Sequence, residues 1–274
     1  MSVGDLGRRN ADSNADHGRV YTCLKAAAID YRFRPGEQIM IGELAERLRV
    51  SSTPVRETLI RLQTEALLET APRRGFFAKT LNLKEMSDLV QLRFLILKGA
   101  IEQATDVIAN GAAIALSWII PDSAGVGDTR STARTANRTT LDQPDEAVRY
   151  IEEASESVAA LCHNDAILRA LENMNDRTHY VCMIDLERVG RLMEVQLMLD
   201  ELCLALQRSD VAGVVAVLKN YRDELTERMP ALVKEGISRA YTTPSRMLIA
   251  SQFDAGLPTL RKPVVANRSV FPRR

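Results

Sequence analysis

The chain has 274 residues, of which 46% are hydrophobic and 26% charged, and its 36 basic and 36 acidic side chains balance to a net charge of zero. This length allows two domains, and the composition is ordinary for a globular protein in water, which excludes a membrane-embedded class. The apolar run from Ala112 to Ile120 is too short to span a bilayer, and Met1 to Asp16 is polar, unlike a signal peptide. We therefore expect a cytoplasmic protein.

Charge is distributed unevenly along the chain. Residues 17–80 carry 11 Lys and Arg against 7 Asp and Glu, residues 81–235 carry 16 against 25, and residues 236–274 carry 7 against 1. A basic N-terminal module joined to an acidic body suits contact with DNA at one end of the molecule only.

Residues 1–16 are rich in Asp, Asn, Ser and Gly and predict a disordered arm. The first helix is predicted from His17 to Tyr31. Its apolar stripe consists of Val20, Leu24, Ala27 or Ala28, and Tyr31. Pro35 and Gly36 then predict a turn that leads to the next helix.

Two short helices around a tight turn are predicted after Ile41. The buried face of the first is formed, at helical spacing, by Ile41, Leu44, Ala45 and Leu48. Thr53 can cap the second helix through its hydroxyl and Pro54 suits the first helical position, so this helix is predicted to begin at one of these two residues. Its buried stripe consists of Val55, Leu59 and Leu62.

Arg56 falls in the first turn of this second helix. In a helix-turn-helix, that turn enters the major groove of DNA and meets the edges of the bases. A guanidinium group matches the two acceptors that guanine presents there. Arg56 is therefore predicted to read guanine.

After Glu65 the pattern changes to two short strands, 66–69 and 76–79. Between them Pro72, Arg73, Arg74 and Gly75 predict a turn with two cations at its tip. A basic hairpin beside a recognition helix can grip phosphates or enter the minor groove. The segment from Ile41 to Thr80 is thus predicted to be a helix-turn-helix with a two-stranded wing.

Three runs stand in this order in the sequence: R-P-G-E-Q-I, L-A-E-R-L-R-V-S-S-T-P-V-R-E-T-L-I-R-L-Q-T-E-A-L-L and P-R-R-G-F-F. Between Arg19 and Thr80 they resemble the winged-helix domain of GntR-family bacterial regulators. That family usually has Arg where Ser52 stands, so base reading is expected to depend more on Arg56 and Arg49. Residues predicted to contact DNA are Arg34, Arg49, Ser51, Ser52, Thr53, Arg56, Arg61, Arg73, Arg74 and Gly75.

The rest of the chain has the pattern of helices without a convincing strand. Helices are predicted at 83–108, at 112–120, from Pro144 onward, at 165–174, at 178–207, and from the cap Asp210 to about Lys234. Residues 121–143 have the composition of a long loop, and residues 239–274 that of an extended basic tail. The predicted fold is mostly α: a winged helix-turn-helix over 17–80, then an all-α antiparallel helical bundle over 81–238.

A long helix directly after the wing and the final run S-D-V-A-G-V-V-A-V-L-K-N-Y resemble the helical, FCD-type effector domain of FadR-like GntR regulators. Many members of that branch hold a divalent metal with one Asp and three His. The corresponding residues here are Glu152, Glu156, Leu199 and Tyr221. Because the imidazoles are absent, we expect no family-type metal site and predict no cofactor. The resemblance implies a small-molecule effector such as a carboxylate, and the predicted effector-binding residues are Arg93, Glu152, Glu156 and Tyr221.

Several of these side chains admit two interpretations. Arg93, beside an apolar stripe, needs either an acidic partner or an anionic ligand. Glu152 and Glu156 could bind a cation, although Glu153 beside them favours a solvated acidic face. The histidines are favoured as isolated side chains and the cysteines as buried thiols of a reducing cytoplasm; they are His17, His163, His179, Cys23, Cys162, Cys182 and Cys203.

Three functions remain open from the sequence. The favoured one is a non-enzymatic transcription regulator, a repressor, whose homodimer binds a near-palindromic operator in double-stranded DNA and responds to an effector. The second is an enzyme localised by its DNA-binding module, against which the sparse histidines and absent metal spacing speak. The third is a DNA-binding protein whose bundle is a ligand-free dimerisation domain.

Overall fold

The computed structural model describes residues 17–109 and 143–242. Contacts divide these residues into two compact units, one formed by 17–82 and 233–242, the other by 83–109 and 143–232. Within these described ranges the chain passes between the units twice, after Asn82 and inside the last helix. The predicted arm, the predicted helix at 112–120, nearly all of the predicted loop at 121–143 and most of the tail lie outside the described residues.

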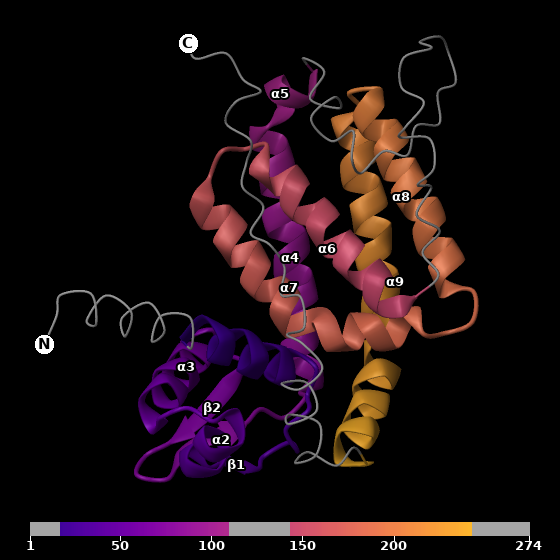
Figure 1. Cartoon of the computed structure of the whole chain (residues 1–274). Coiled ribbons are helices and arrows are strands. Elements are labelled where there is room, and N and C mark those ends of the chain that lie inside the picture. Colours follow the sequence, from indigo (N-terminus) through magenta and orange to yellow (C-terminus); the bar gives the residue numbers. More distant parts are fainter. Residues whose placement is uncertain (1–16, 110–142, 243–274) are drawn as a thin grey trace, which may run out of the picture. The chain divides into compact units, whose positions relative to one another are not determined.

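The first unit is a winged helix-turn-helix, as predicted (Figure 1). A helix at 17–29 comes first. It is followed by β1 (Gln38–Ile39), α2 (Ile41–Leu48), α3 (Ser52–Thr64), β2 (Leu68–Ala71) and β3 (Gly75–Ala78). These elements enclose one apolar core, whose buried residues include Val20, Leu24, Ala27, Leu44, Leu48, Val55, Leu59 and Leu62. The core stripes predicted for the first helix and for both helices of the motif are therefore confirmed, apart from Ile41 and Tyr31.

The wing has three strands where the sequence predicted two. They are antiparallel in the order β1-β3-β2, with Gln38 opposite Phe77 and Leu68 opposite Ala78. β1 is only two residues long, and so short a segment has no period that a sequence pattern could reveal. Its backbone pairing anchors the base of the wing to the segment before α2.

Two details at the helix ends of this unit differ from the prediction. Tyr31 has a left-handed backbone (φ 51°) and is partly exposed, because the helix ends before it; buried Phe33 joins the core instead. α3 begins at Ser52, and its N-cap is Ser51, whose extended backbone makes no side-chain cap bond. Thr53 is therefore inside the first turn and is not the cap.

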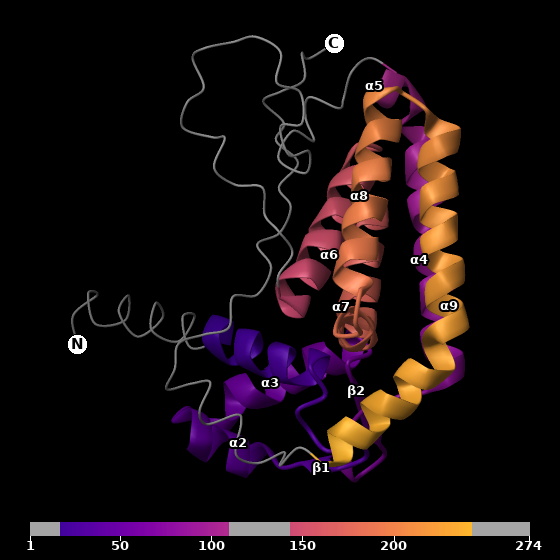
Figure 2. The same ribbon diagram turned by 90° about the vertical axis from the view of Figure 1, so that its right-hand side faces the viewer.

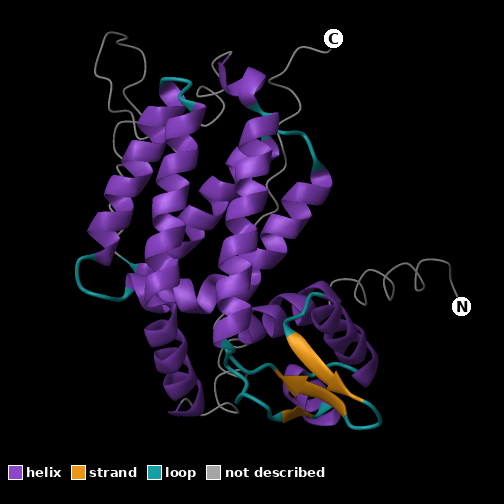
Figure 3. Ribbon diagram, turned by 180° about the vertical axis from the view of Figure 1, so that it is seen from behind, coloured by secondary structure: helices purple, strands orange, loops and turns teal. Residues whose placement is uncertain are grey.

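The second unit is all-helical over the described residues and forms the predicted bundle (Figures 2 and 3). Its helices are α4 (Leu83–Gln103), α5 (Thr105–Ala109), α6 (Pro144–Ala160), α7 (Asp165–Leu186), α8 (Arg191–Gln207) and α9 (Val211–Thr242). α9 lies beside α4 in Figure 2, and α6 and α7 pack closely on each other and on α4. Part of the core is a cluster of Leu97, Ala100, Ala159 and Leu171.

The helix predicted at 83–108 is interrupted at Ala104, which separates α4 from α5. The hydroxyl of Thr105 donates to the carbonyl of Glu102 (2.8 Å) at this break. Such a local side-chain bond competes with the helical hydrogen-bond pattern. Ile108 remains buried in the core, so the break does not expose the apolar face.

The boundary predicted between 174 and 178 is wrong, because α7 runs without a break to Leu186. Asn175 and Asp176 look like helix-ending residues in the sequence, but both are buried, and Asn175 donates from Nδ2 to Glu156 Oε1 on α6 (2.7 Å). A polar pair that finds a partner on a neighbouring helix can stay inside a helix. The break comes at Gly190, whose φ of 82° favours glycine.

The start of α9 agrees with the prediction, and its end does not. Asp210 accepts a bond at Oδ1 from the backbone of Gly213 (2.9 Å), as a helix cap does. A Cβ added at Gly213 would lie 2.4 Å from Oδ2 of Asp210, so any larger residue there would displace the capping carboxylate. The helix continues past Lys234 to Thr242 with Pro230 inside it.

Three of the four thiols are buried, as predicted, whereas Cys162 is partly exposed. Burial raises the pKa of Cys23, Cys182 and Cys203 to about 11 in each case. None of the described helices has the length and hydropathy needed to cross a membrane.

Candidate functional site

The turn between α2 and α3 presents the start of α3 to solvent. Arg49 ends α2 in a left-handed conformation (φ 54°), and Ser51, Ser52 and Thr53 are exposed. The first turn of α3 contains no acidic residue, and its N-cap side chain makes no hydrogen bond to the helix backbone. The unsatisfied N–H groups and the positive end of the helix dipole are therefore available to an anion such as a DNA phosphate.

The exposed face of α3 carries Arg56 one turn further along the helix. Arg56 makes no hydrogen bond or ion pair with any described residue. Ile60 is 50% exposed beyond it, an apolar contact that the methyl group of thymine could use and that the sequence interpretation did not single out. Thr58, in contrast, is buried.

Arg61 differs from Arg56 although both are on α3 and both were predicted to contact DNA. Its Nε lies 3.0 Å from Oε1 of Glu65, and its guanidinium group stacks 3.6 Å above the ring of Tyr21. The hydroxyl of Tyr21 donates to the same Glu65 (2.7 Å). These contacts connect α3 to the first helix, so Arg61 already has a structural role.

The turn of the wing holds its two arginines outward. Arg73 and Gly75 have left-handed backbones (φ 62° and 91°), and Arg73, Arg74 and Gly75 are exposed. The guanidinium group of Arg74 lies 5.1 Å from the centre of the Phe77 ring, while the carbonyl of Arg74 accepts a bond from the side chain of Gln38. β1 therefore stiffens the base of the turn. Arg34 is also exposed, in the loop before β1.

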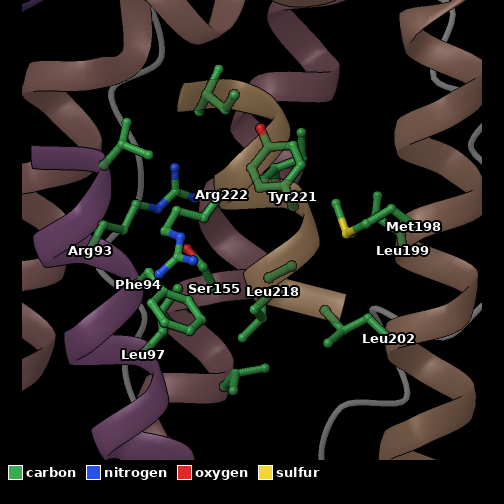
Figure 4. Close-up of a pocket in the computed structure, with 15 residues that line it drawn as sticks. Arg93, Phe94, Leu97, Ser155, Met198, Leu199, Leu202, Leu218, Tyr221 and Arg222 are labelled. Carbon is green, nitrogen blue, oxygen red and sulfur yellow. The ribbon is translucent and has the colours of Figure 1, made fainter. Parts of the chain in front are cut away.

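The bundle contains a cavity with about 620 Å³ of space not filled by atoms, part of it open to solvent (Figure 4). Helices α4, α6, α8 and α9 contribute its walls. Most lining side chains are apolar: Val90, Phe94, Leu97, Ile151, Ala154, Val158, Met198, Leu199, Leu202, Leu218 and Leu225. The polar exceptions are Arg93, Ser155, Tyr221 and Arg222.

The cavity brings Arg93 and Tyr221 together, two of the four residues predicted for an effector site. Arg93 is only 7% exposed, yet it makes no hydrogen bond or ion pair with any described residue. The Tyr221 hydroxyl likewise has no partner among them. Burial raises the pKa of Tyr221, which keeps its phenol neutral and able to donate a hydrogen bond.

Arg222 is a second cation at this cavity, and the sequence interpretation missed it. Figure 4 shows its guanidinium group reaching into the same space as that of Arg93. It lies 4.3 Å from the centre of the Phe94 ring, and its Nε donates to Asp223 (2.8 Å). The sequence did contain a signal for Arg222. It lies one helical turn after Leu218 and directly after Tyr221, and these two residues have the spacing of the buried face of a helix.

Glu152 and Glu156, the other two residues predicted for the effector, are not among the lining residues. Both are 1% exposed, so the expected solvated acidic face is wrong. Nδ1 of His179 lies 3.1 Å from Oε1 of Glu152, and Asn175 donates to Glu156. His179 is therefore paired, not isolated. An acidic pattern at the surface of a helix and one at a buried polar seam have the same sequence spacing, which explains the error.

A buried ionic cluster joins α7, α8 and α9, and no sequence signal pointed to it. Asp185 is 1% exposed and accepts bonds from Arg228 at 2.9 and 3.3 Å, while Nη2 of Arg191 lies 3.3 Å away. Arg191 also contacts Glu194 and Glu224. The five residues come from three helices, so no local motif could identify the cluster.

No group of three or more His, Cys, Asp or Glu side chains within residues 17–109 and 143–242 is arranged to hold a metal ion. Leu199 and Tyr221, which the sequence resemblance matched to histidines of the FadR-like branch, line the cavity. Apart from its arginines and hydroxyls, the cavity offers a ligand hydrocarbon surface.

Comparison with known proteins agrees with this geometry. Residues 17–78 match the model of the family described as "Bacterial regulatory proteins, gntR family". The chain is 28% identical over 221 residues to the Nta operon transcriptional regulator of Aminobacter aminovorans, covering 80% of this chain and 99% of that protein. It is also 33% identical over 61 residues to the transcriptional regulator McbR of Escherichia coli, covering 22% of this chain and 28% of that protein.

Solved structures resemble about four fifths of the chain. The structure of E. coli McbR/YncC gives a TM-score of 0.54 at 17% identity, covering 80% of this chain and 97% of that one. A GntR-type regulator from Rhodococcus sp. RHA1 gives 0.52 at 18% identity, covering 79% and 98%. At these identities the likeness establishes a shared fold only. The sequence matches show that the chain is a transcriptional regulator whose residues 17–78 match the gntR-family DNA-binding domain.

Proposed function

We propose that this regulator binds a near-palindromic operator in the cytoplasm as a homodimer, represses transcription there, and changes its affinity for DNA when a small organic acid occupies the bundle cavity. It acts without catalysis. On this proposal the bundle is an FCD-type effector domain that works without a metal ion.

The DNA half of the proposal is supported by the exposed start of α3. An unpartnered Arg56 and an uncapped helix N-terminus present a guanidinium fork for base edges and N–H groups for phosphate. The paired arginines elsewhere on the unit lack this freedom, as the contacts of Arg61 illustrate. Two copies would place two such helices on the half-sites of one operator.

The effector half depends on one observation: Arg93 is buried at the cavity without an anionic partner in the described chain. Removing a guanidinium group from water without a partner costs free energy, which an anionic ligand would recover through charge-assisted hydrogen bonds. The phenol of Tyr221 and the guanidinium group of Arg222 add two further donors at the same cavity. A carboxylate head is therefore the group that the polar end fits.

The apolar walls specify the rest of the ligand. Side chains such as Leu199, Leu202 and Leu225 cannot hydrogen-bond to hydroxyl or second carboxylate groups. The effector is accordingly an acid with one anionic end and a hydrocarbon or aromatic body. A polyhydroxylated or polycarboxylate acid would leave polar groups unsatisfied against these walls.

Regulation follows from linkage. A ligand that fits the cavity better in one state of the dimer shifts the population toward that state by its difference in affinity. The same coupling energy must then appear as a change in operator affinity. Without such a change the bundle would serve dimerisation only.

The test pairs ligand binding with operator binding. Thermal unfolding is measured with a panel of apolar monocarboxylic acids, and operator affinity is then measured by fluorescence anisotropy with and without each stabilising acid. We expect at least one acid to do both, and Arg93→Met to lose the ligand-induced shift while the ligand-free melting temperature stays equal or rises, because an unpaired charge is removed.

Arg169→Met is the matched control, since Arg169 is an exposed arginine of the same unit. It should keep the ligand-induced shift. An acid that saturates the protein without altering operator affinity would remove the sensing role and leave DNA binding intact. A large loss of ligand-free stability in Arg93→Met would show that Arg93 has an internal partner and would overturn the carboxylate clamp.

A further inference from the structure

Helix α4 exposes an apolar stripe that the bundle does not cover. Leu92 and Leu95 are 47% and 52% exposed, and Gly99 follows them on the same helix face. A Cβ added at Gly99 would meet nothing within 4 Å, so the backbone is open to close approach there. This face is opposite to the buried side chains of α4, such as Leu89 and Leu97.

Charged pairs flank the apolar stripe at both ends. Lys84 Nζ lies 2.6 Å from Asp88, and Lys98 Nζ lies 2.9 Å from Glu102. All four side chains are more than 40% exposed. Along the helix the order is thus basic, acidic, apolar, basic, acidic. We call these six residues and Gly99 the α4 stripe.

When this order of charges is laid antiparallel on a second copy of itself, each basic residue falls opposite an acidic one. Lys84 and Glu102 are each nine residues from residue 93, on opposite sides, and Asp88 and Lys98 are each five residues from it. A second α4 laid antiparallel on the first would place Lys84 opposite Glu102 of the second copy and Asp88 opposite its Lys98. The leucines would meet at the centre. A two-fold interface requires this self-complementarity, because each surface must match itself.

We propose that the α4 stripe is the surface on which a second copy of the chain packs, α4 against α4, about a two-fold axis near residue 93. The proposal rests on the homodimer of the proposed function and gives that dimer a specific surface. In this arrangement the two Leu83 ends are separated by about 20 residues of helical rise, roughly 30 Å. That distance is of the order of the spacing between operator half-sites one helical turn apart, about 34–36 Å.

α8 also exposes apolar side chains, but its charges disfavour the same arrangement. Met193 and Leu197 are 68% and 58% exposed. Leu204, 44% exposed, extends this run. The charged residues between Met193 and Leu204 are Glu194, Asp200 and Glu201, with no basic residue among them, so an antiparallel second copy would bring acidic residues near each other. Like charges placed opposite each other oppose association. The α8 face is therefore a suitable internal control.

The first experiment removes the apolar centre. Sedimentation equilibrium of the full chain compares the wild type with the double variant Leu92→Glu/Leu95→Glu and with the control Met193→Glu/Leu197→Glu on α8. We expect the α4 variant to weaken dimerisation by about 100-fold or more and the α8 control to change it by less than about threefold. Circular dichroism confirms that each variant is folded.

The second experiment uses the charges alone and does not disturb the leucines. K84E/K98E makes the α4 stripe wholly acidic, and D88K/E102K makes it wholly basic. Each variant alone should dissociate, and an equal mixture of the two should form a heterodimer at least as tight as the wild-type dimer, with an affinity that falls as salt rises.

The outcomes separate this proposal from the proposed function. If the wild type is a dimer and all α4 variants remain dimers, the surface is elsewhere and this inference is overturned, while operator and effector binding are unaffected. If α4 variants are monomers that still bind the effector acid but bind the operator weakly, both proposals are supported. A wild type that is monomeric at every concentration, with or without operator DNA, overturns the α4 interface and the dimer together.

Discussion

Two arginines, one in each unit, lack a partner for opposite reasons. Arg56 on α3 is in water, and Arg93 on α4 is buried beside an apolar cavity. Neither makes a hydrogen bond or ion pair with a described residue. Water solvates Arg56 until DNA, a large polyanion, displaces that water. Arg93 lost its water during folding, and only a small anion can reach it in the cavity.

The comparison extends to the other charges of the two units. On the first unit, Arg61 is paired at the surface, where its side chain is 62% exposed. In the bundle, Asp185, Arg191 and Arg228 are paired in the interior. An exposed ion pair is worth little, while breaking a buried one leaves a charge without solvent or partner. Substitutions in the two units should therefore differ in size and in the property that they change.

The largest effect is expected inside the bundle. Asp185→Leu leaves Arg191 and Arg228 without their shared carboxylate and should lower the free energy of unfolding by about 3–5 kcal/mol. Glu194→Gln removes an exposed partner of the same Arg191 and should cost under about 1 kcal/mol. Urea unfolding of both variants measures the difference; equal costs would show that the interior cluster is no stronger than a surface pair.

A new charge in the interior should also be costly, and pH can create one at Cys182. Burial raises the pKa of this thiol from its ordinary value of 9.0 to about 11. The unfolded chain then ionises first, so stability is fully present below pH 9 and falls as pH rises toward about 11, by roughly 2–3 kcal/mol for this group. Urea unfolding under reducing conditions across this range should give a smaller decline for Cys182→Ala than for the wild type. Identical declines would contradict the burial effect.

On the DNA-binding unit the expected changes are in recognition and not in stability. Arg56→Ala should reduce the preference for operator over random DNA by about 1–3 kcal/mol while the melting temperature stays the same. Arg61→Ala, which removes a cation already paired with Glu65, should leave that preference nearly intact. Fluorescence anisotropy with operator and random duplexes in competition measures this preference. Equal discrimination by Arg56→Ala and the wild type would refute base reading by Arg56.

The smallest effect is expected at the wing. Replacing both Arg73 and Arg74 with Ala should weaken binding to any duplex and reduce the slope of log affinity against log salt by about 2, one unit for each lost phosphate contact. Titrations at several salt concentrations measure this slope. If it is unchanged, the wing does not touch the DNA backbone.

The sequence predicted the structure best at positions where a helical period of apolar residues coincides with burial in the core. The core positions Leu44, Leu48, Val55, Leu59 and Leu62 have the helical period and are buried. The order of elements from α2 to β3 follows from the same period and from the turn residues of the wing. The two-residue β1 has no period of its own, so it could not be predicted.

Inside the bundle, the sequence could not distinguish polar residues that face water from those that face another helix. Glu152 and Glu156 fit an exposed acidic face, yet they are buried against His179 and Asn175 on α7. The helix break predicted between 174 and 178 was wrong for the same reason, because Asn175 there is buried against α6. The cavity itself depends on four helices. Arg93 was selected because it lies beside an apolar stripe and Tyr221 because of the family resemblance, whereas Arg222 was missed.

The one partly exposed thiol offers a practical consequence. Cys162, at the junction of α6 and α7, packs against the cluster that includes Leu97, and Leu97 also lines the cavity. The other three cysteines are shielded by their surroundings, so a maleimide dye should attach to Cys162 first and without any engineering of the natural chain. Its fluorescence would then report on the interior of the bundle from a single known position.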